Sequence, residues 1–282
     1  MAINDVLISG TPRSGTTLSC HLLNKVDDTV ALHEPMRGKE WAGLSHDEIA
    51  KSVVAFCAEQ RRSLHDRGRA TSRNVDGIVP QDPHGSREED ANRKSRAPLG
   101  EIVVDKALSP DFTLVVKHNA GFTAILDALV KKFRVYAVLR NPLAALASWN
   151  TIDFPPGRGR SPAAERVDHG LRDALDSLEN TLDRQLLLLD WFYSRWHRYI
   201  PAENFIRYED VIETKGAALS LIQPAAASLS EPLESRNLSG RYGSETVQRI
   251  GLRLLESDGA YWRSYTRESV EAVLDASLAE SR

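Results

Sequence analysis

Short apolar runs alternate with segments of helical periodicity from Val6 to Asp210. The runs have the length and residue types of buried strands, and they lie at Asp5–Ser9, Val30–Leu32, Phe112–Lys117, Arg134–Leu139 and Asn204–Tyr208. The segments between them place apolar residues on one helical face, and they lie at Leu18–Lys25, Ile49–Cys57, Ile125–Val130, Leu143–Trp149 and Ala163–Tyr199. Apolar strands that alternate with helices predict an α/β fold, with a central parallel sheet flanked by helices on both faces.

Two of the helical segments carry further signals. Ser45-His-Asp-Glu48 is a capping box and predicts the start of a helix. Ala163–Tyr199 has room for one helix or two, and its stripe of leucines predicts core packing. Further helices are expected after Asp210, as far as Arg282.

The periodic pattern of apolar residues is interrupted over residues 60–98. Basic residues are mixed there with acids, Gly, Pro and Ser, and little periodicity is visible. We expect a variable loop, which acts as a lid over a site or is a solvated insertion without a specific role. The rest of the 282 residues fits a single domain, 1–282.

Composition and charge narrow the class of protein. Lys and Arg number 36 and Asp and Glu number 39, which gives a formal net charge of −3. This balance argues against a protein that coats nucleic acid or an anionic membrane, but it allows a local basic pocket. No run reaches the roughly 20 apolar residues of a membrane helix, and no signal peptide is visible. Cys20 and Cys57 have no metal or redox spacing, so we expect reduced core thiols in a cytoplasmic protein.

The connection between the first predicted strand and helix has the pattern of a phosphate-binding loop. It reads Gly10-Thr-Pro-Arg-Ser-Gly15. Glycines let the backbone approach an anion, and the amides of residues 14–17 would point at it from the positive end of the helix. A Walker A loop would continue with lysine, whereas Thr16 follows here and the cation lies earlier, at Arg13. A kinase or NTPase of the usual kind is therefore disfavoured.

Two motifs resemble those of one enzyme family. Thr11-Pro-Arg-Ser-Gly-Thr-Thr17 resembles the 5′-phosphosulfate loop of sulfotransferases that use 3′-phosphoadenosine-5′-phosphosulfate (PAPS). Arg140-Asn-Pro-Leu-Ala-Ala-Leu-Ala-Ser148 resembles their 3′-phosphate motif, and a guanidinium and a hydroxyl both suit a phosphate. Phe205-Ile-Arg-Tyr-Glu-Asp210 also resembles a stretch common in these enzymes, and we interpret it as structural. The likeness runs from about Val6 to Asp210 and is weak over residues 60–98.

The resemblance implies a P-loop NTPase-like sulfotransferase fold and a reaction. The style of the motifs is most similar to the carbohydrate and tyrosylprotein sulfotransferases. The enzyme would move a sulfuryl group from PAPS to an acceptor hydroxyl by in-line attack, leaving 3′,5′-phosphoadenosine (PAP). The residues that would hold the nucleotide are Arg13, Ser14, Gly15, Thr16, Thr17, Arg140 and Ser148. No cluster has metal-ligand spacing, and the chemistry requires no metal.

Charge stabilisation and proton transfer need further side chains. Cations near the bridging oxygen would stabilise the charge that grows on the leaving phosphate. Arg13 is the first candidate and Lys117, at a strand end, is the second. Three side chains compete as the base for the acceptor hydroxyl, namely His33, Glu34 and His118.

Strand alternation and the resemblance favour Glu34 as the base. If Lys117 faces the site, His118 turns away, and Asn119 stands where the cytosolic branch of the family has a histidine base. Glu34 follows the second strand at the same sheet edge as the loop, and it resembles the glutamate base of the tyrosylprotein and carbohydrate enzymes. The structural alternative for Glu34 is a salt bridge, with Arg37 as the partner considered.

The end of the chain should complete the nucleotide site. Arg241, in Ser239-Gly-Arg-Tyr-Gly243, offers a cation with flexible flanks. Two other functions stay open: a small-molecule kinase with an unusual loop, and a non-catalytic nucleotide-binding protein. The acceptor and the oligomeric state carry no readable signature.

Overall fold

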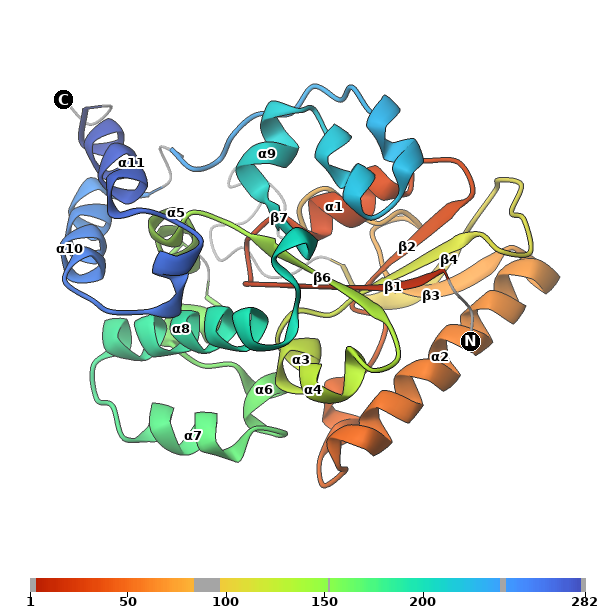
Figure 1. Cartoon of the computed structure of the whole chain (residues 1–282), viewed down its shortest axis with the longest axis horizontal. Helices are drawn as coiled ribbons and strands as arrows, with labels where there is room; N and C mark the ends of the chain where they lie inside the picture. The colour runs from red at the N-terminus through yellow and green to blue at the C-terminus, as the bar shows by residue number, and fades with distance from the viewer. Residues whose placement is uncertain (1–3, 84–96, 152, 239–241, 280–282) are drawn as a thin grey trace.

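The chain folds around a parallel sheet of five strands, shown in Figure 1. The computed structural model describes residues 4–83, 97–151, 153–238 and 242–279. The strands follow the order β2-β5-β1-β6-β7, with bounds β1 (Asp5–Gly10), β2 (Thr29–His33), β5 (Thr113–Lys117), β6 (Arg134–Leu139) and β7 (Phe205–Arg207). All neighbouring pairs in this sheet are parallel. The α/β prediction is confirmed.

Helices cover both faces of the sheet (Figure 1), and successive strand residues belong to the two buried clusters on opposite faces. On β1, Leu7 belongs to one buried cluster, whereas Val6 and Ile8 belong to the other. Residues of four elements cover the face with Val6 and Ile8: α1 (Thr16–Leu23), α9 (Tyr208–Glu213), η4 (Ala217–Leu221) and η5 (Pro224–Ser228). The face with Leu7 is covered by α2 (His46–Arg67), α3 (Asn119–Ala124), α4 (Leu126–Leu129), α5 (Pro142–Trp149), α8 (Thr181–Tyr199), α10 (Ser244–Leu255) and α11 (Arg267–Ala279). Both faces are thus filled, as the apolar strands predict.

The segment 60–98 contains more regular structure than its composition indicates. Helix α2 begins at the predicted capping box and continues to Arg67. Strand β3 (Arg69–Arg73) follows and pairs antiparallel with β4 (Leu99–Val103). Only Ala70 and Ser72 of β3 are buried, so its sequence lacks an apolar signal. The expectation of a loop beginning at residue 60 is therefore wrong for this first part.

The stretch Ala163–Tyr199 forms three helices, where one or two were expected. They are α6 (Pro162–Glu165), α7 (His169–Asp176) and α8. Asp168 caps α7 by accepting from the Leu171 amide, and Asn180 caps α8. These caps divide the leucine stripe, which is buried as predicted except at the half-buried Leu178.

Short 3₁₀ segments complete the fold. They are η1 (Gly38–Trp41), η2 (Pro155–Arg158), η3 (Ala202–Asn204) and η6 (Ala260–Arg263). Cys20 and Cys57 are both buried and free, as expected for core thiols. Among the described residues, no helix combines the length and the apolar character that crossing a membrane requires.

Candidate functional site

The loop between β1 and α1 makes a tight turn at the carboxyl edge of the sheet. The Ser14 amide donates to the Thr11 carbonyl at 3.1 Å, and the Ser14 hydroxyl donates to the same oxygen at 2.8 Å. A Cβ atom on Gly10 would lie 2.8 Å from the Val138 carbonyl oxygen on the adjacent strand. Glycine is therefore required for the loop to leave the sheet here.

Gly15 occupies the N-cap position of α1. Its φ is 86°, and a Cβ atom there would lie 2.6 Å from the Tyr208 ring. Glycine has no side chain to cap the helix, and no cap bond to α1 is found among the described residues, so the amides of the first turn can bind another acceptor. Gly15, Thr16 and Thr17 line a cavity of about 650 Å³. The positive end of a helix in such a cavity favours an anion.

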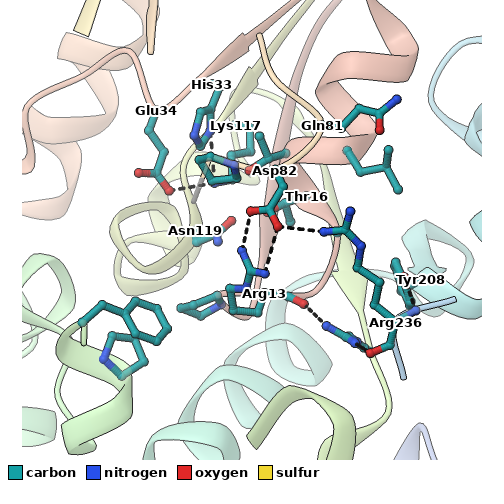
Figure 2. Close-up of a pocket in the computed structure, with 18 of the residues that line it drawn as sticks. Arg13, Thr16, His33, Glu34, Gln81, Asp82, Lys117, Asn119, Tyr208 and Arg236 are labelled. Carbon is teal, nitrogen blue, oxygen red and sulfur yellow. Dashed lines mark hydrogen bonds and ion pairs between the residues drawn. The ribbon is translucent and has the colours of Figure 1, made fainter. Parts of the chain in front are cut away.

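Arg13 projects from the loop into this cavity, where its side chain contacts Asp82 and Ser148 among the described residues. Its Nη1 and Nη2 atoms donate to Asp82 at 2.8 and 3.3 Å, and its Nε donates to Ser148 Oγ at 3.2 Å. Asp82 also accepts from Arg236 Nη1 at 2.7 Å. Figure 2 shows the carboxylate between the two guanidinium groups. The predicted Arg13 is thus in the cavity, together with two residues that sequence reasoning missed.

Glu34 and Lys117 form an ion pair at the ends of adjacent strands. Parallel pairing places His33 beside Lys117, and the Glu34 amide donates to the Lys117 carbonyl at 2.8 Å. Lys117 Nζ lies 2.7 Å from Glu34 Oε1 and 3.3 Å from His33 Nδ1 (Figure 2). Arg73 is a more distant partner, with its Nε 3.9 Å from Glu34 Oε2. The considered salt bridge of Glu34 thus exists, but its partner is Lys117 rather than Arg37.

Burial and charge set the protonation of this pair and its neighbour. Burial would by itself raise the pKa of Glu34, but the charge and hydrogen bond of Lys117, together with His33 and His118, hold that pKa well below its usual value. Burial, followed by the Lys117 charge, lowers the pKa of His33 to about 3. At neutral pH the carboxylate is therefore charged and the His33 imidazole is neutral.

His118 and Asn119 line the same cavity beside Lys117. The His118 ring packs against Trp41 and Phe122, although strand alternation predicted that His118 would turn away from the site. Burial lowers the pKa of His118. Within the described part of the chain, His118 Nδ1 and Asn119 Oδ1 are buried without a hydrogen-bond partner.

Arg140 is buried behind the loop and its donors are engaged by protein groups. Its Nη1 donates to the Arg13 carbonyl at 2.7 Å, and its Nη2 donates to the Arg236 carbonyl at 2.6 Å. Its Nε donates to Asn237 Oδ1 at 2.8 Å, and the guanidinium lies 4.8 Å from the Tyr208 ring centre. Arg140 therefore holds the two segments that carry Arg13 and Arg236. Its contact with a 3′-phosphate, and that of Ser148, stay predictions.

The stretch Phe205–Asp210 does more than end a strand. The Tyr208 ring lies against Gly15, and its hydroxyl accepts from the Arg236 amide at 3.0 Å. Glu209 accepts from the Asn141 amide at 3.0 Å and from Asn237 Nδ2 at 2.7 Å. The motif therefore fixes the loop, the start of α5 and the segment of Arg236. The sequence signal that could have revealed this role was the resemblance of Phe205–Asp210 to a stretch common in sulfotransferases.

The remaining predictions concern Arg241 and metals. Arg241 lies outside the described residues. No group of three or more His, Cys, Asp or Glu side chains in the described ranges is arranged to hold a metal ion.

Comparisons with known proteins give two distant structural neighbours among the matches described. No family model matches the chain, and no curated protein matches it. Among solved structures, sulfotransferase STF9 from Mycobacterium avium is 16% identical, with a TM-score of 0.36, and the match covers 99% of this chain and 77% of that one. Sulfotransferase STF1 from Mycobacterium tuberculosis H37Rv is 14% identical, with a TM-score of 0.34 and coverage of 96% and 76%. At these values the function has to be argued from the site.

Proposed function

We propose that this chain is a PAPS-dependent sulfotransferase that moves a sulfuryl group to an acceptor hydroxyl and leaves PAP. The observation that carries the proposal is one cavity that combines the uncapped start of α1 with the Lys117–Glu34 pair. The helix end suits a phosphosulfate, and the pair offers a cation and a base beside it.

The donor fits the chemistry of the cavity. Gly15, Thr16 and Thr17, at the start of a helix, line it, and a side chain in place of Gly15 would collide with Tyr208. Ser14 to Thr17 would hold the phosphosulfate, while Arg140 and Ser148 would act at the 3′-phosphate. A volume of about 650 Å³ lies in the range of small-molecule sites.

Lys117 and Arg13 would stabilise charge during transfer. As the acceptor oxygen bonds to sulfur, the bond from sulfur to the phosphate oxygen breaks, and negative charge grows on that phosphate. A buried ammonium and a guanidinium at this point lower the energy of the transition state more than that of the ground state. Lys117 is only 2% exposed, so its charge is weakly screened by water.

Glu34 would take the acceptor proton. Its low pKa in the ion pair makes it a weak base as long as Lys117 contacts it. When Lys117 turns towards the anionic donor, its interaction with Glu34 weakens and the pKa of Glu34 rises. The same movement therefore stabilises the leaving group and activates the base.

The test begins with binding and proceeds to transfer. Saturating PAP should raise the unfolding temperature, whereas ATP with Mg²⁺ should not. Labelled PAPS should then transfer sulfur to members of a panel of alcohols, phenols and sugars, and Arg13→Ala and Glu34→Gln should each remove most of that transfer. No stabilisation by PAP would refute the proposal, and stabilisation by ATP with Mg²⁺ alone would establish a kinase. PAP binding without transfer to any acceptor would favour a non-catalytic nucleotide-binding protein.

A further inference from the structure

The carboxylate of Asp82 lies inside the cavity and bridges two arginines. Its Oδ1 is 2.8 Å from Arg13 Nη1, and its Oδ2 is 2.7 Å from Arg236 Nη1. The side chains of Asp82 and Arg13 are both 12% exposed, so water screens their contact little. Figure 2 shows Asp82 near Thr16, at the start of α1. We call Arg13 and Arg236 together the anion site.

The segment that carries Asp82 is anchored on one side. Val79 is buried, and its carbonyl accepts a hydrogen bond from His21 Nδ1 on α1 at 2.9 Å. Pro80 and Pro83 flank Gln81 and Asp82, and proline restricts the backbone there. Asp82 thus lies three residues after a fixed point, in a stretch where proline restricts the backbone.

The arrangement of Asp82 is that of a ligand anion. A carboxylate bound by two guanidinium groups makes the contacts that sulfate or phosphate oxygens make with arginine. A second anion on the same nitrogen atoms of Arg13 would lie against the Asp82 carboxylate, and like charges in contact repel. A bound sulfate or phosphate group and Asp82 therefore exclude one another at the anion site.

We propose that Asp82 is an intramolecular competitor that fills the anion site of the ligand-free protein and is displaced when an anionic ligand binds. The ligand class is a molecule bearing sulfate or phosphate, and its identity as PAPS or PAP rests on the proposed function. Because a ligand must displace Asp82, its apparent affinity is its intrinsic affinity multiplied by the fraction of molecules in which the anion site is open. A ligand with several anionic groups overcomes this cost, whereas a small single anion gains too little. The cost is the same for free sulfate and for the polyanionic donor, so Asp82 lowers both affinities alike and only the donor keeps a useful affinity.

The surroundings of Arg236 allow its side chain to change partner in such an exchange. Its backbone is fixed, because its amide donates to Tyr208 and its carbonyl accepts from Arg140. Its side chain is 49% exposed and is free to reorient once Asp82 leaves. The guanidinium that now holds Asp82 then becomes a second cation for the ligand.

The alternative to the competitor role is a positioning role, in which Asp82 orients Arg13 for catalysis. The two roles predict opposite results. A competitor weakens ligand binding, so its removal tightens binding; a positioning residue supports the site, so its removal weakens binding or slows transfer without tightening it.

Asp82→Asn tests the competitor role directly, because it removes the charge and keeps the shape. We expect calorimetry to show that PAP binds the variant about tenfold more tightly than the wild type, a difference in binding free energy of about 1.4 kcal/mol. Inorganic sulfate, titrated by thermal shift, should also bind more tightly. Asp76→Asn is the matched control: it removes the same charge from an exposed turn outside the cavity lining, at φ 51°, where asparagine is tolerated. It should leave both affinities unchanged. Asp82→Ala should act in the same direction, and its unfolding curve verifies the fold.

The two probes separate this proposal from the proposed function. Tighter sulfate binding in Asp82→Asn, with no PAP binding in any variant, would support the competitor and overturn the sulfotransferase. Equal or weaker PAP binding in folded Asp82→Asn and Asp82→Ala would overturn the competitor while leaving the PAP site in place. Absence of binding by either probe to any variant would overturn both.

Discussion

The ion pair between Lys117 and Glu34 gives the most direct test of the site. Glu34→Gln keeps the shape of the side chain but removes the charge. It leaves the Lys117 ammonium, which is 2% exposed, without the carboxylate 2.7 Å away. A buried charge that loses its partner is destabilising, so the variant should unfold more easily as well as lose activity.

The size of the effect follows from the burial of the two partners. Breaking a fully buried pair costs about 3–5 kcal/mol, and breaking an exposed pair costs about 0.2–1 kcal/mol. The Glu34 side chain is 31% exposed, so the pair lies between these limits, at about 2 kcal/mol. For a chain of 282 residues this corresponds to a fall of about 3 °C in unfolding temperature. Loss of a general base should lower kcat by a factor of about 10²–10⁴.

A double-mutant cycle isolates the interaction. Urea unfolding of the wild type, Glu34→Gln, Lys117→Met and the double variant should give a double variant more stable than the summed single losses imply. The coupling should be about 1–2 kcal/mol. Single losses that add within about 0.5 kcal/mol would refute a stabilising ion pair.

The stability difference between wild type and Glu34→Gln should change with pH in one direction only. The pKa of Glu34 is lower in the folded protein than in the unfolded chain, so the pair stabilises the fold above the unfolded value of about 4.3. As pH falls from there towards the folded pKa, the carboxylate is protonated and the contribution is lost. The stability difference between wild type and Glu34→Gln should therefore be constant from about pH 6 to 8 and shrink below about pH 4.

Three further substitutions test the surroundings of the pair. Gly15→Ala should cost at least about 2 kcal/mol in urea unfolding, because φ is 86° and the new Cβ meets the Tyr208 ring; unchanged stability would contradict the loop geometry. Arg140→Met should destabilise by about 2–4 kcal/mol, since buried carbonyls such as that of Arg13 lose their donor, and a wild-type unfolding temperature would argue against this role. His33→Asn should not change the pH profile of kcat/KM near pH 6.5, because the pKa of His33 is about 3. If the wild type showed an inflection near pH 6.5 and the variant lost it, His33 would be the base.

The predicted elements that held are those with local signals. The strand β1, the glycine-bracketed loop and α1 follow one another within Asp5–Leu23, so their order and chemistry are readable from neighbouring residues. The sheet edge shared by Arg13, Glu34 and Lys117 was also predictable, because parallel strands end at a common edge. Strand β3 was missed because its buried positions are Ala70 and Ser72, which give no apolar alternation.

Contacts between distant segments were decided by the tertiary structure alone. Asp82 lies 69 residues from Arg13 and 154 from Arg236, and no local pattern links them. The engagement of Arg140 with main-chain carbonyls is equally invisible, since any carbonyl looks alike in a sequence. The fold class and the position of the glycine-bracketed loop could be read from the sequence, because backbone geometry and the alternation of strands and helices follow from nearby residues. Which side chain pairs with each charge could not be read from it, because those pairings arise when chain segments far apart pack together.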